Sequence, residues 1–233
     1  MNIAIVMPSM RSQNWAQIAA DLAAVQSRQV RVTWLPVIYP REYQAAAVSD
    51  REVLYGPAAP RWIQPLVIAE EPGVNHIVRK QNAALDELEL NHFSGWFFSW
   101  NDDNRIPSAL GTRLAAQMTG EASPGVIVFS CKRGQRIPPD VTPERAFATH
   151  DLIAAPEHMR VGYVTGEQYA IHTRLLNGRR FAHHPCCDGI MVESLHRQMP
   201  QEFRFVPDYF VPFNALEPGR WDSEELNKVI NQP

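Results

Sequence analysis

The stretch Gly95–Asn104, which reads GWFFSWNDDN, joins an apolar run to four adjacent polar side chains. The apolar half predicts a strand buried on both faces, because its apolar residues do not alternate with polar ones. It leads directly into the carboxylates of Asp102 and Asp103, which Asn101 and Asn104 flank. Ligands of open α/β sheets bind at the carboxyl ends of the strands. The segment therefore predicts a ligand site.

The chemistry of these four side chains narrows the range of possible ligands. Carboxylate and amide oxygens suit a hard cation such as Mg²⁺ or Mn²⁺. Proteins commonly hold Mg²⁺ by one or two carboxylates together with phosphate oxygens of the substrate. The segment thus indicates a cation bound together with a phosphate compound. The alternative is an Asx-rich turn that caps the helix expected to begin near Pro107.

Apolar runs and helical periodicities alternate along the rest of the chain. The opening order of strand, helix and strand favours a βαβ unit with parallel strands. We therefore expect an α/β fold that forms a single domain over residues 1–233. The expected strands are 3–7, 30–37, 66–69, 95–100, 126–131, 169–171, 203–206 and 210–213, and the expected helices are 14–28, 75–88, 107–118 and 189–199.

Three spans lack these patterns. Prolines at positions 57, 60 and 65 predict irregular structure between residues 40 and 65. The basic, proline-rich segment 132–143 predicts a loop, and residues 216–233 form a polar tail.

Composition excludes several classes of protein. Hydrophobic residues make up 45% of the 233 residues and charged residues 20%, which is ordinary globular usage. The net charge of -3 weighs against nucleic acid as a partner. No run approaches 18 apolar residues, so no membrane span is expected. Three cysteines, two of them adjacent, suit a reducing compartment, and we expect a cytoplasmic protein. Dinucleotide, P-loop, zincin and α/β-hydrolase motifs are absent from the sequence.

Two further segments are expected at the same edge of the sheet. Pro8 and Ser9 end the first strand, and Arg79, Lys80 and Asn82 lie in the first half of the helix after Asn75. Basic and amide side chains there suit an anionic ligand. The alternatives are a simple strand-ending turn and a solvated helix face.

The segment His183–Gly189 (HHPCCDG) carries a second acidic candidate. Asp188 precedes the helix expected at 189–199, where it is either a cap or a general base. The neighbouring side chains raise two lesser alternatives, a zinc site and a nucleophilic Cys186, but their spacing matches no known signature. Glu167 and His172, in the strand-like region before this segment, either face an acceptor or are structural.

Taken in order, these segments resemble the GT-A glycosyltransferases, especially the family 2-like group, over about residues 3–213. The resemblance rests on IAIVMPS, RKQNAAL, FFSWNDDNRIPSAL and CCDGIMVESLHRQ, the last of which starts at Cys186. It implies a Rossmann-like, mixed and mainly parallel sheet flanked by helices. It also implies a nucleotide-binding part at about 1–104 and an acceptor-side part at about 105–215. In such a protein, acceptor specificity would lie in the irregular spans 40–65 and 132–172.

The resemblance implies an activity and roles for particular residues. The protein would transfer a sugar from a UDP- or GDP-sugar to a glycan or small-molecule acceptor, with Mn²⁺ or Mg²⁺. Asp103 would be the principal metal ligand, assisted by Asp102, and Asp188 would be the base of an inverting reaction. The nucleotide-sugar would contact Pro8, Ser9, Arg79, Lys80, Asn82, Asn101 and Asp102.

The sequence departs from the family pattern at several positions. Asn101 stands at the first position of the DxD motif, and Cys187 replaces the first residue of an acidic pair. The second strand ends in Val37-Ile38-Tyr39 without a carboxylate, and no histidine follows His196. Three other functions therefore stay open: an inactive GT-A-like domain that binds carbohydrate or protein, a nucleotidyltransferase, and sugar transfer to a modified DNA base.

Overall fold

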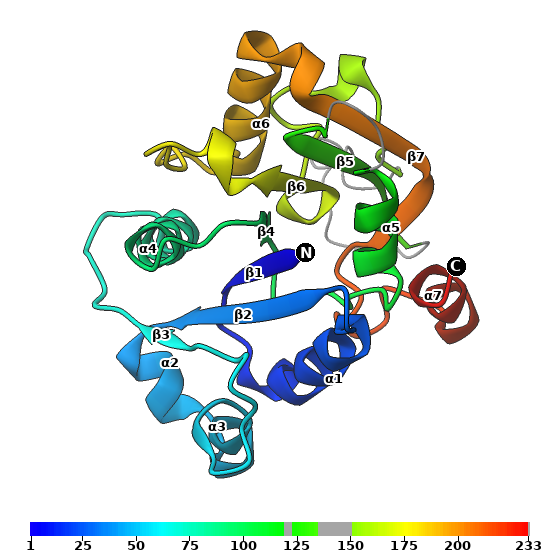
Figure 1. Cartoon of the computed structure of the whole chain (residues 1–233). Coiled ribbons are helices and arrows are strands. Elements are labelled where there is room, and N and C mark those ends of the chain that lie inside the picture. The colour runs from blue at the N-terminus through cyan, green and yellow to red at the C-terminus, as the bar shows by residue number, and fades with distance from the viewer. Residues whose placement is uncertain (119–122, 135–150, 233) are drawn as a thin grey trace.

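The computed structural model of the chain describes residues 1–118, 123–134 and 151–232. Its strands form one sheet in the order β3-β2-β1-β4-β6-β5-β7 (Figure 1). Neighbouring strands run parallel except at β6, which is antiparallel to both β4 and β5. The expected mixed, mainly parallel α/β sheet is confirmed. The strands are β1 (Asn2–Pro8), β2 (Arg31–Ile38), β3 (Leu66–Val67), β4 (Trp96–Ser99), β5 (Val126–Lys132), β6 (Tyr169–His172) and β7 (Phe203–Pro212).

Helices cover both faces of the sheet (Figure 1). The α-helices are α1 (Trp15–Val25), α2 (Pro40–Ala45), α3 (Val48–Tyr55), α4 (His76–Leu90), α5 (Leu110–Ala116), α6 (Cys187–Gln198) and α7 (Ser223–Ile230). Short 3₁₀ turns are η1 (Ser12–Asn14), η3 (Pro156–His158), η4 (Gly166–Gln168), η5 (Thr173–Leu175) and η6 (Pro200–Glu202).

The central strand β1 explains why its sequence is apolar throughout. Ile3 and Ile5 lie in the core cluster that includes residues of α1 and α5, whereas Ala4 and Val6 lie in the cluster that includes residues of α4 and α6. Successive side chains of a strand point to opposite faces, so a strand covered on both faces must be apolar at every position. The expected parallel βαβ unit, β1-α1-β2, is confirmed.

The helix cap expected at Asn75 is confirmed. Its Oδ1 accepts hydrogen bonds from the backbone N–H groups of Ile77 and Val78, at 3.0 and 3.3 Å. The cap satisfies two donors that the first turn of α4 would otherwise leave unpaired.

The span 40–65, expected to be irregular, instead contains α2 and α3. Pro40 occupies the first turn of α2, where its missing N–H is not needed, and the Glu42 carboxylate accepts a hydrogen bond of 2.7 Å from the Tyr39 backbone N–H. The helix α3 ends at Tyr55, before Gly56, so the prolines that follow interrupt neither helix.

The polar tail also holds a packed element. Asp222 caps α7 by accepting from the Glu224 and Glu225 backbone N–H groups, and Val229 and Ile230 are buried. The two short strands expected at 203–206 and 210–213 are one strand, β7, whose pairing with β5 shifts register after Phe129. Residues 135–143 of the expected basic loop lie outside the described residues.

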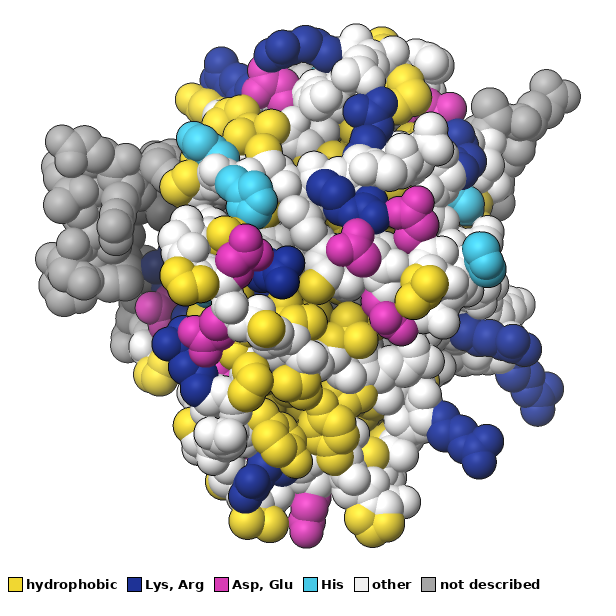
Figure 2. All heavy atoms as spheres, turned by 90° about the vertical axis from the view of Figure 1, so that its left-hand side faces the viewer, with side chains coloured by type: hydrophobic (Ala, Val, Ile, Leu, Met, Phe, Trp, Pro, Cys, Tyr) yellow, Lys and Arg dark blue, Asp and Glu magenta, His cyan; other side chains and the backbone are white. Residues whose placement is uncertain are grey.

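The surface to the left of Figure 1 has two distinct regions. Figure 2 shows hydrophobic side chains gathered in its lower half, at the height of α2, α3 and β3, which carry the exposed Val48, Tyr55 and Val67. Across the middle, basic side chains lie beside acidic ones, as in the ion pairs that join Arg180 to Asp86 and Glu89. In the described ranges, no helix combines the length and the apolar character needed to span a membrane.

We predict that Ile230→Ala lowers the free energy of unfolding by about 2 kcal/mol, because Ile230 is a buried residue of α7, which lies against β7. Urea denaturation of the whole chain measures this. The control is Leu90→Ala, at a position that is 74% exposed, where a change within about 0.5 kcal/mol is expected. Equal effects of the two substitutions would show that α7 does not contribute to the core.

Candidate active site

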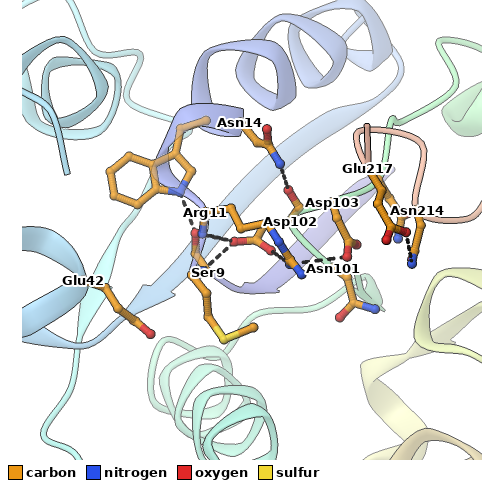
Figure 3. A network of polar contacts seen from close by, with 12 residues as sticks. Ser9, Arg11, Asn14, Glu42, Asn101, Asp102, Asp103, Asn214 and Glu217 are labelled. Carbon is orange, nitrogen blue, oxygen red and sulfur yellow. Dashed lines mark hydrogen bonds and ion pairs between the residues drawn. The ribbon is translucent and has the colours of Figure 1, made fainter. Parts of the chain in front are cut away.

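The candidate site lies where the loops after β1 and β4 meet at the carboxyl edge of the sheet (Figure 3). The loop after β1 contains Ser9, Met10 and Arg11, and the loop after β4 contains Asn101–Asn104. Because β6 runs antiparallel to β4, the start of β6 reaches this edge, and η4 stands there. The sheet topology therefore brings three separate stretches of sequence together.

The Asp102 carboxylate is buried and holds the loop after β1. Its Oδ2 accepts hydrogen bonds from the backbone N–H groups of Met10 and Arg11, at 2.5 and 2.6 Å, and from Ser9 Oγ at 3.3 Å. Its Oδ1 accepts from Arg11 Nη1 at 2.8 Å. On the other side, Asn14 donates to the Asp102 carbonyl oxygen at 2.7 Å. Both oxygens expected to bind a metal or a sugar thus already have protein donors.

Asp103 differs from its neighbour in having an unsatisfied oxygen. Its side chain is 13% exposed, and Oδ2 lies 3.3 Å from Arg11 Nη1. Its Oδ1 is buried and has no hydrogen-bond partner among the described residues. Burial raises the pKa of Asp103 to about 6, against the opposing effect of Arg11. A buried carboxylate oxygen without a donor is suited to accept a cation or a ligand N–H or O–H group.

Lys80, expected to contact the nucleotide-sugar, is fully buried. Its Nζ donates to the Ser9 carbonyl oxygen at 2.6 Å and to Glu42 Oε2 at 2.5 Å, and lies 4.4 Å from the centroid of the Tyr39 ring. Burial lowers the pKa of Lys80, and Glu42 acts in the opposite direction. The ammonium group therefore joins α4 to α2 and to the loop after β1.

The other residues expected to contact the nucleotide-sugar fall into two groups, those that are buried or bonded within the protein and those that are exposed. Pro8 and Ser9 are buried, and the Asn82 side chain exchanges hydrogen bonds of 3.0 and 2.8 Å with the Phe181 backbone. Arg79, in contrast, is 39% exposed and lies 3.3 Å from Glu71, and Asn101 is partly exposed. Of this group, Arg79 and Asn101 are accessible to a ligand.

Glu167 is fully buried beneath the loop after β4. Its Oε1 accepts from the Asn101 backbone N–H at 3.0 Å and from Asn104 Nδ2 at 2.8 Å, whereas Oε2 has no partner among the described residues. Burial raises its pKa. Gly166 permits this approach, since a Cβ there would lie 2.6 Å from the Ser99 carbonyl oxygen. Sequence alone singles out Glu167, Asn101 and Asn104, but not the hydrogen bonds that join them.

Asp188 lies in the first turn of α6 and points toward other elements. Its Oδ1 accepts hydrogen bonds of 3.2 Å from both Gln81 Nε2 and Tyr169 OH. Gln81 also donates to Ser99 Oγ, at 2.6 Å, which links Asp188 to the end of β4. Burial raises the pKa of Asp188 to about 6, although both hydrogen bonds act in the opposite direction. Gln81 and Tyr169 have no sequence signal beyond their helical and strand positions.

A hollow of about 470 Å³ adjoins this edge. It is lined by Met10, Ser12 and Gln13 from the β1 side and by Arg41, Glu42 and Ala45 from α2. A second hollow, of about 380 Å³, includes Phe93 before β4 and His172 at the end of β6, and so lies at the opposite edge of the sheet. His172 is thus not part of the candidate site.

Within the described part of the chain, no three His, Cys, Asp or Glu side chains converge as metal ligands. This removes support for zinc at His183–Gly189, where the buried Cys187 thiol lies 3.4 Å from Gln81 Oε1. A Mg²⁺ or Mn²⁺ ion needs fewer protein ligands, because substrate phosphates and waters complete its coordination. The unpartnered oxygen of Asp103 fits such an ion.

Several solved structures are similar to this chain. The sequence matches no protein-family model and no curated protein sequence. One similar structure is the mannosyltransferase PcManGT from Pyrobaculum calidifontis in complex with GDP-Man and Mn²⁺, with a TM-score of 0.60 and 14% identity over 94% of this chain. Another is TarS from S. aureus, with a TM-score of 0.55 and 12% identity over 91% of this chain.

The chain has a GT-A glycosyltransferase fold. The resemblance expected from the sequence is therefore confirmed at the level of the fold. The chain spans 58% of the length of PcManGT and 36% of that of TarS.

We predict that Asp102→Asn lowers the free energy of unfolding by about 3 kcal/mol. The amide has one acceptor oxygen, so its NH₂ group would face donors, either the Arg11 guanidinium at Oδ1 or the Met10 and Arg11 backbone N–H groups at Oδ2, and those donors would lose their acceptor. Urea denaturation at pH 7 measures the change. The exposed Asp86→Asn is the control, and a parent-like stability of Asp102→Asn would contradict the anchoring role.

Asp103→Asn should have the opposite effect, an increase of about 1 to 3 kcal/mol at pH 7. The folded-state pKa of about 6 exceeds the usual value near 3.9, so the folded chain binds more protons between about pH 4 and 6. The contribution of Asp103 to stability therefore falls as the pH rises through that window. The advantage of the variant should shrink toward pH 4. Equal stabilities at pH 7 would contradict the burial argument.

Proposed function

We propose that the chain is a glycosyltransferase that moves a sugar from a nucleotide-sugar to a hydroxyl group of an acceptor. The observation that carries this proposal is the unpartnered, buried carboxylate oxygen of Asp103 at the carboxyl edge of a GT-A sheet. The same edge holds a second carboxylate of raised pKa, Asp188. The Asp103 carboxylate suits the donor, and the Asp188 carboxylate suits the acceptor.

The hollow beside the loop after β1 suits the nucleoside of the donor. It opens between this loop and α2, next to Arg11, so a nucleoside there would direct its phosphates toward Asp103. The complex of PcManGT with GDP-Man supports this class of donor. A UDP- or GDP-sugar is thus proposed, and residues 1–104 would supply most of its contacts.

The charges at this edge support a divalent cation. Three carboxylates, those of Asp102, Asp103 and Glu217, act on the single guanidinium of Arg11. A diphosphate would add further negative charge. Mn²⁺ or Mg²⁺ held by Asp103 would supply neutralisation of the departing diphosphate. The Mn²⁺ in the PcManGT complex supports this choice of ion.

Asp188 is proposed as the general base. Its carboxylate would accept the proton of the acceptor hydroxyl as that oxygen bonds to the anomeric carbon and the sugar–phosphate bond breaks. Gln81 and Tyr169 would hold Oδ1 in place. Attack opposite the leaving group would invert the anomeric configuration. A glycan or small molecule is the proposed acceptor.

Thermal unfolding with GDP and with UDP, each with and without Mn²⁺, tests the donor site. One nucleotide should stabilise the parent by about 2.7 kcal/mol at 100 times its dissociation constant, and only with Mn²⁺. Asp103→Asn should abolish that stabilisation, whereas Asp86→Asn should keep it. No stabilisation by either nucleotide would favour the inactive binding domain instead.

Asp188→Asn tests the base. The variant should bind the nucleotide like the parent but release nucleoside diphosphate from nucleotide-sugar, with a panel of glycans, about 10²-fold more slowly or worse. In the parent, kcat/KM should fall as the pH drops below about 6, because protonated Asp188 cannot accept a proton. Unchanged turnover of the variant would remove Asp188 from the mechanism.

A further inference from the structure

Arg11 places a positive charge between the two acidic residues of the candidate site (Figure 3). Its Nη1 atom donates to Asp102 Oδ1 at 2.8 Å and lies 3.3 Å from Asp103 Oδ2. The guanidinium therefore neutralises the carboxylate that the proposed cation would need. A divalent cation at Asp103 and the guanidinium in its present position would compete for the same negative charge.

The side chain of Arg11 has hydrogen-bond donors that are not used within the described part of the protein. It is 42% exposed, and its Nε and Nη2 atoms have no partner among the described residues. A guanidinium presents five N–H groups in a planar fork that matches two phosphate oxygens. Arg11 can thus bind an anion without any change in its protonation.

The backbone of Arg11 is held separately from its side chain. Its N–H group donates to Asp102 Oδ2 at 2.6 Å, alongside the N–H group of Met10. If the guanidinium turned away, Asp102 Oδ2 would keep these backbone donors, whereas Oδ1 would lose the donor that Arg11 supplies. The side chain can therefore change its partner while the backbone of Arg11 stays in place.

We propose that Arg11 exchanges partners when the donor binds: it leaves Asp103 to the divalent cation and turns to a phosphate of the nucleoside diphosphate. This inference rests on the proposed function, which it deepens by assigning a phosphate-binding residue. The ligand is the diphosphate group of the donor or of the released nucleotide. Arg11 thus opposes binding of the cation alone and assists binding of the nucleotide.

Removal of the charge should then have two effects of opposite sign. In Arg11→Met, the dissociation constant of Mn²⁺ alone should decrease about tenfold, because a competing cation near Asp103 is lost. The dissociation constant of GDP or UDP at saturating Mn²⁺ should increase about tenfold or more, because charged hydrogen bonds to phosphate are lost. A merely structural role would weaken both.

Isothermal titration calorimetry of the whole chain with MnCl₂ alone, then with nucleotide at saturating Mn²⁺, measures both effects. Arg174→Met is the control, since Arg174 is also 42% exposed and paired with a carboxylate, Glu202, but follows β6 at the opposite edge of the sheet. It should leave both constants unchanged. Arg11→Gln, which removes the charge but keeps polar contacts, replaces Arg11→Met if that variant unfolds.

The outcomes separate this inference from the proposed function. Equal Mn²⁺ affinities of the parent and the Arg11 variants, including no measurable binding by either, would overturn the exchange. Nucleotide affinity that is unchanged in the variants would overturn it as well. A parent that binds neither nucleotide with Mn²⁺ would overturn the proposed function, whatever the Mn²⁺ titration gives.

Discussion

The Asp102 carboxylate lies out of water and accepts hydrogen bonds from two backbone N–H groups, a hydroxyl and a guanidinium of the loop after β1. Burial of an ionised carboxylate is tolerated only when donors replace its hydration. This requirement fixes the loop after β1 against the loop after β4. Asn14 completes the arrangement by holding the Asp102 carbonyl oxygen. The direction of Asp103, and with it the candidate site, follows from this constraint.

Several residues that were expected to touch the ligand instead support those that can. Ser9, Lys80 and Asn82 are joined to other parts of the protein by hydrogen bonds. The fully buried ammonium of Lys80 is stabilised by the Ser9 carbonyl oxygen, by Glu42 and by the ring of Tyr39. Polar side chains near a ligand site thus have two roles, and their number in the sequence overstates the number of contacts available to a substrate.

The fold could be predicted from the sequence more fully than the site. Apolar runs without alternation gave the central strands, and helical periodicity gave α1 and α4, because both patterns are local. The helix α2 was missed, since its stabilisation depends on the Glu42 carboxylate reaching back to Tyr39. Nothing in the letters Asp-Asp distinguishes Asp102 from Asp103, because distant donors decide which of them is satisfied. The rule that site residues follow strands does not place Glu167 at the site, because Glu167 precedes β6, which is antiparallel.

The antiparallel strand β6 also divides the molecule. Strands β1 to β4 come from residues 2–99 and form one half of the sheet, whereas β5, β6 and β7 come from residues 126–212 and form the other. Among the described residues, the ladder between the halves pairs two positions, Trp96 with His172 and Phe97 with Ile171. Asp103 belongs to the first half and Asp188 to the second. Synthesis proceeds from the N-terminus, so the first half, with its network around Asp102, leaves the ribosome before the partner carboxylate of Asp188.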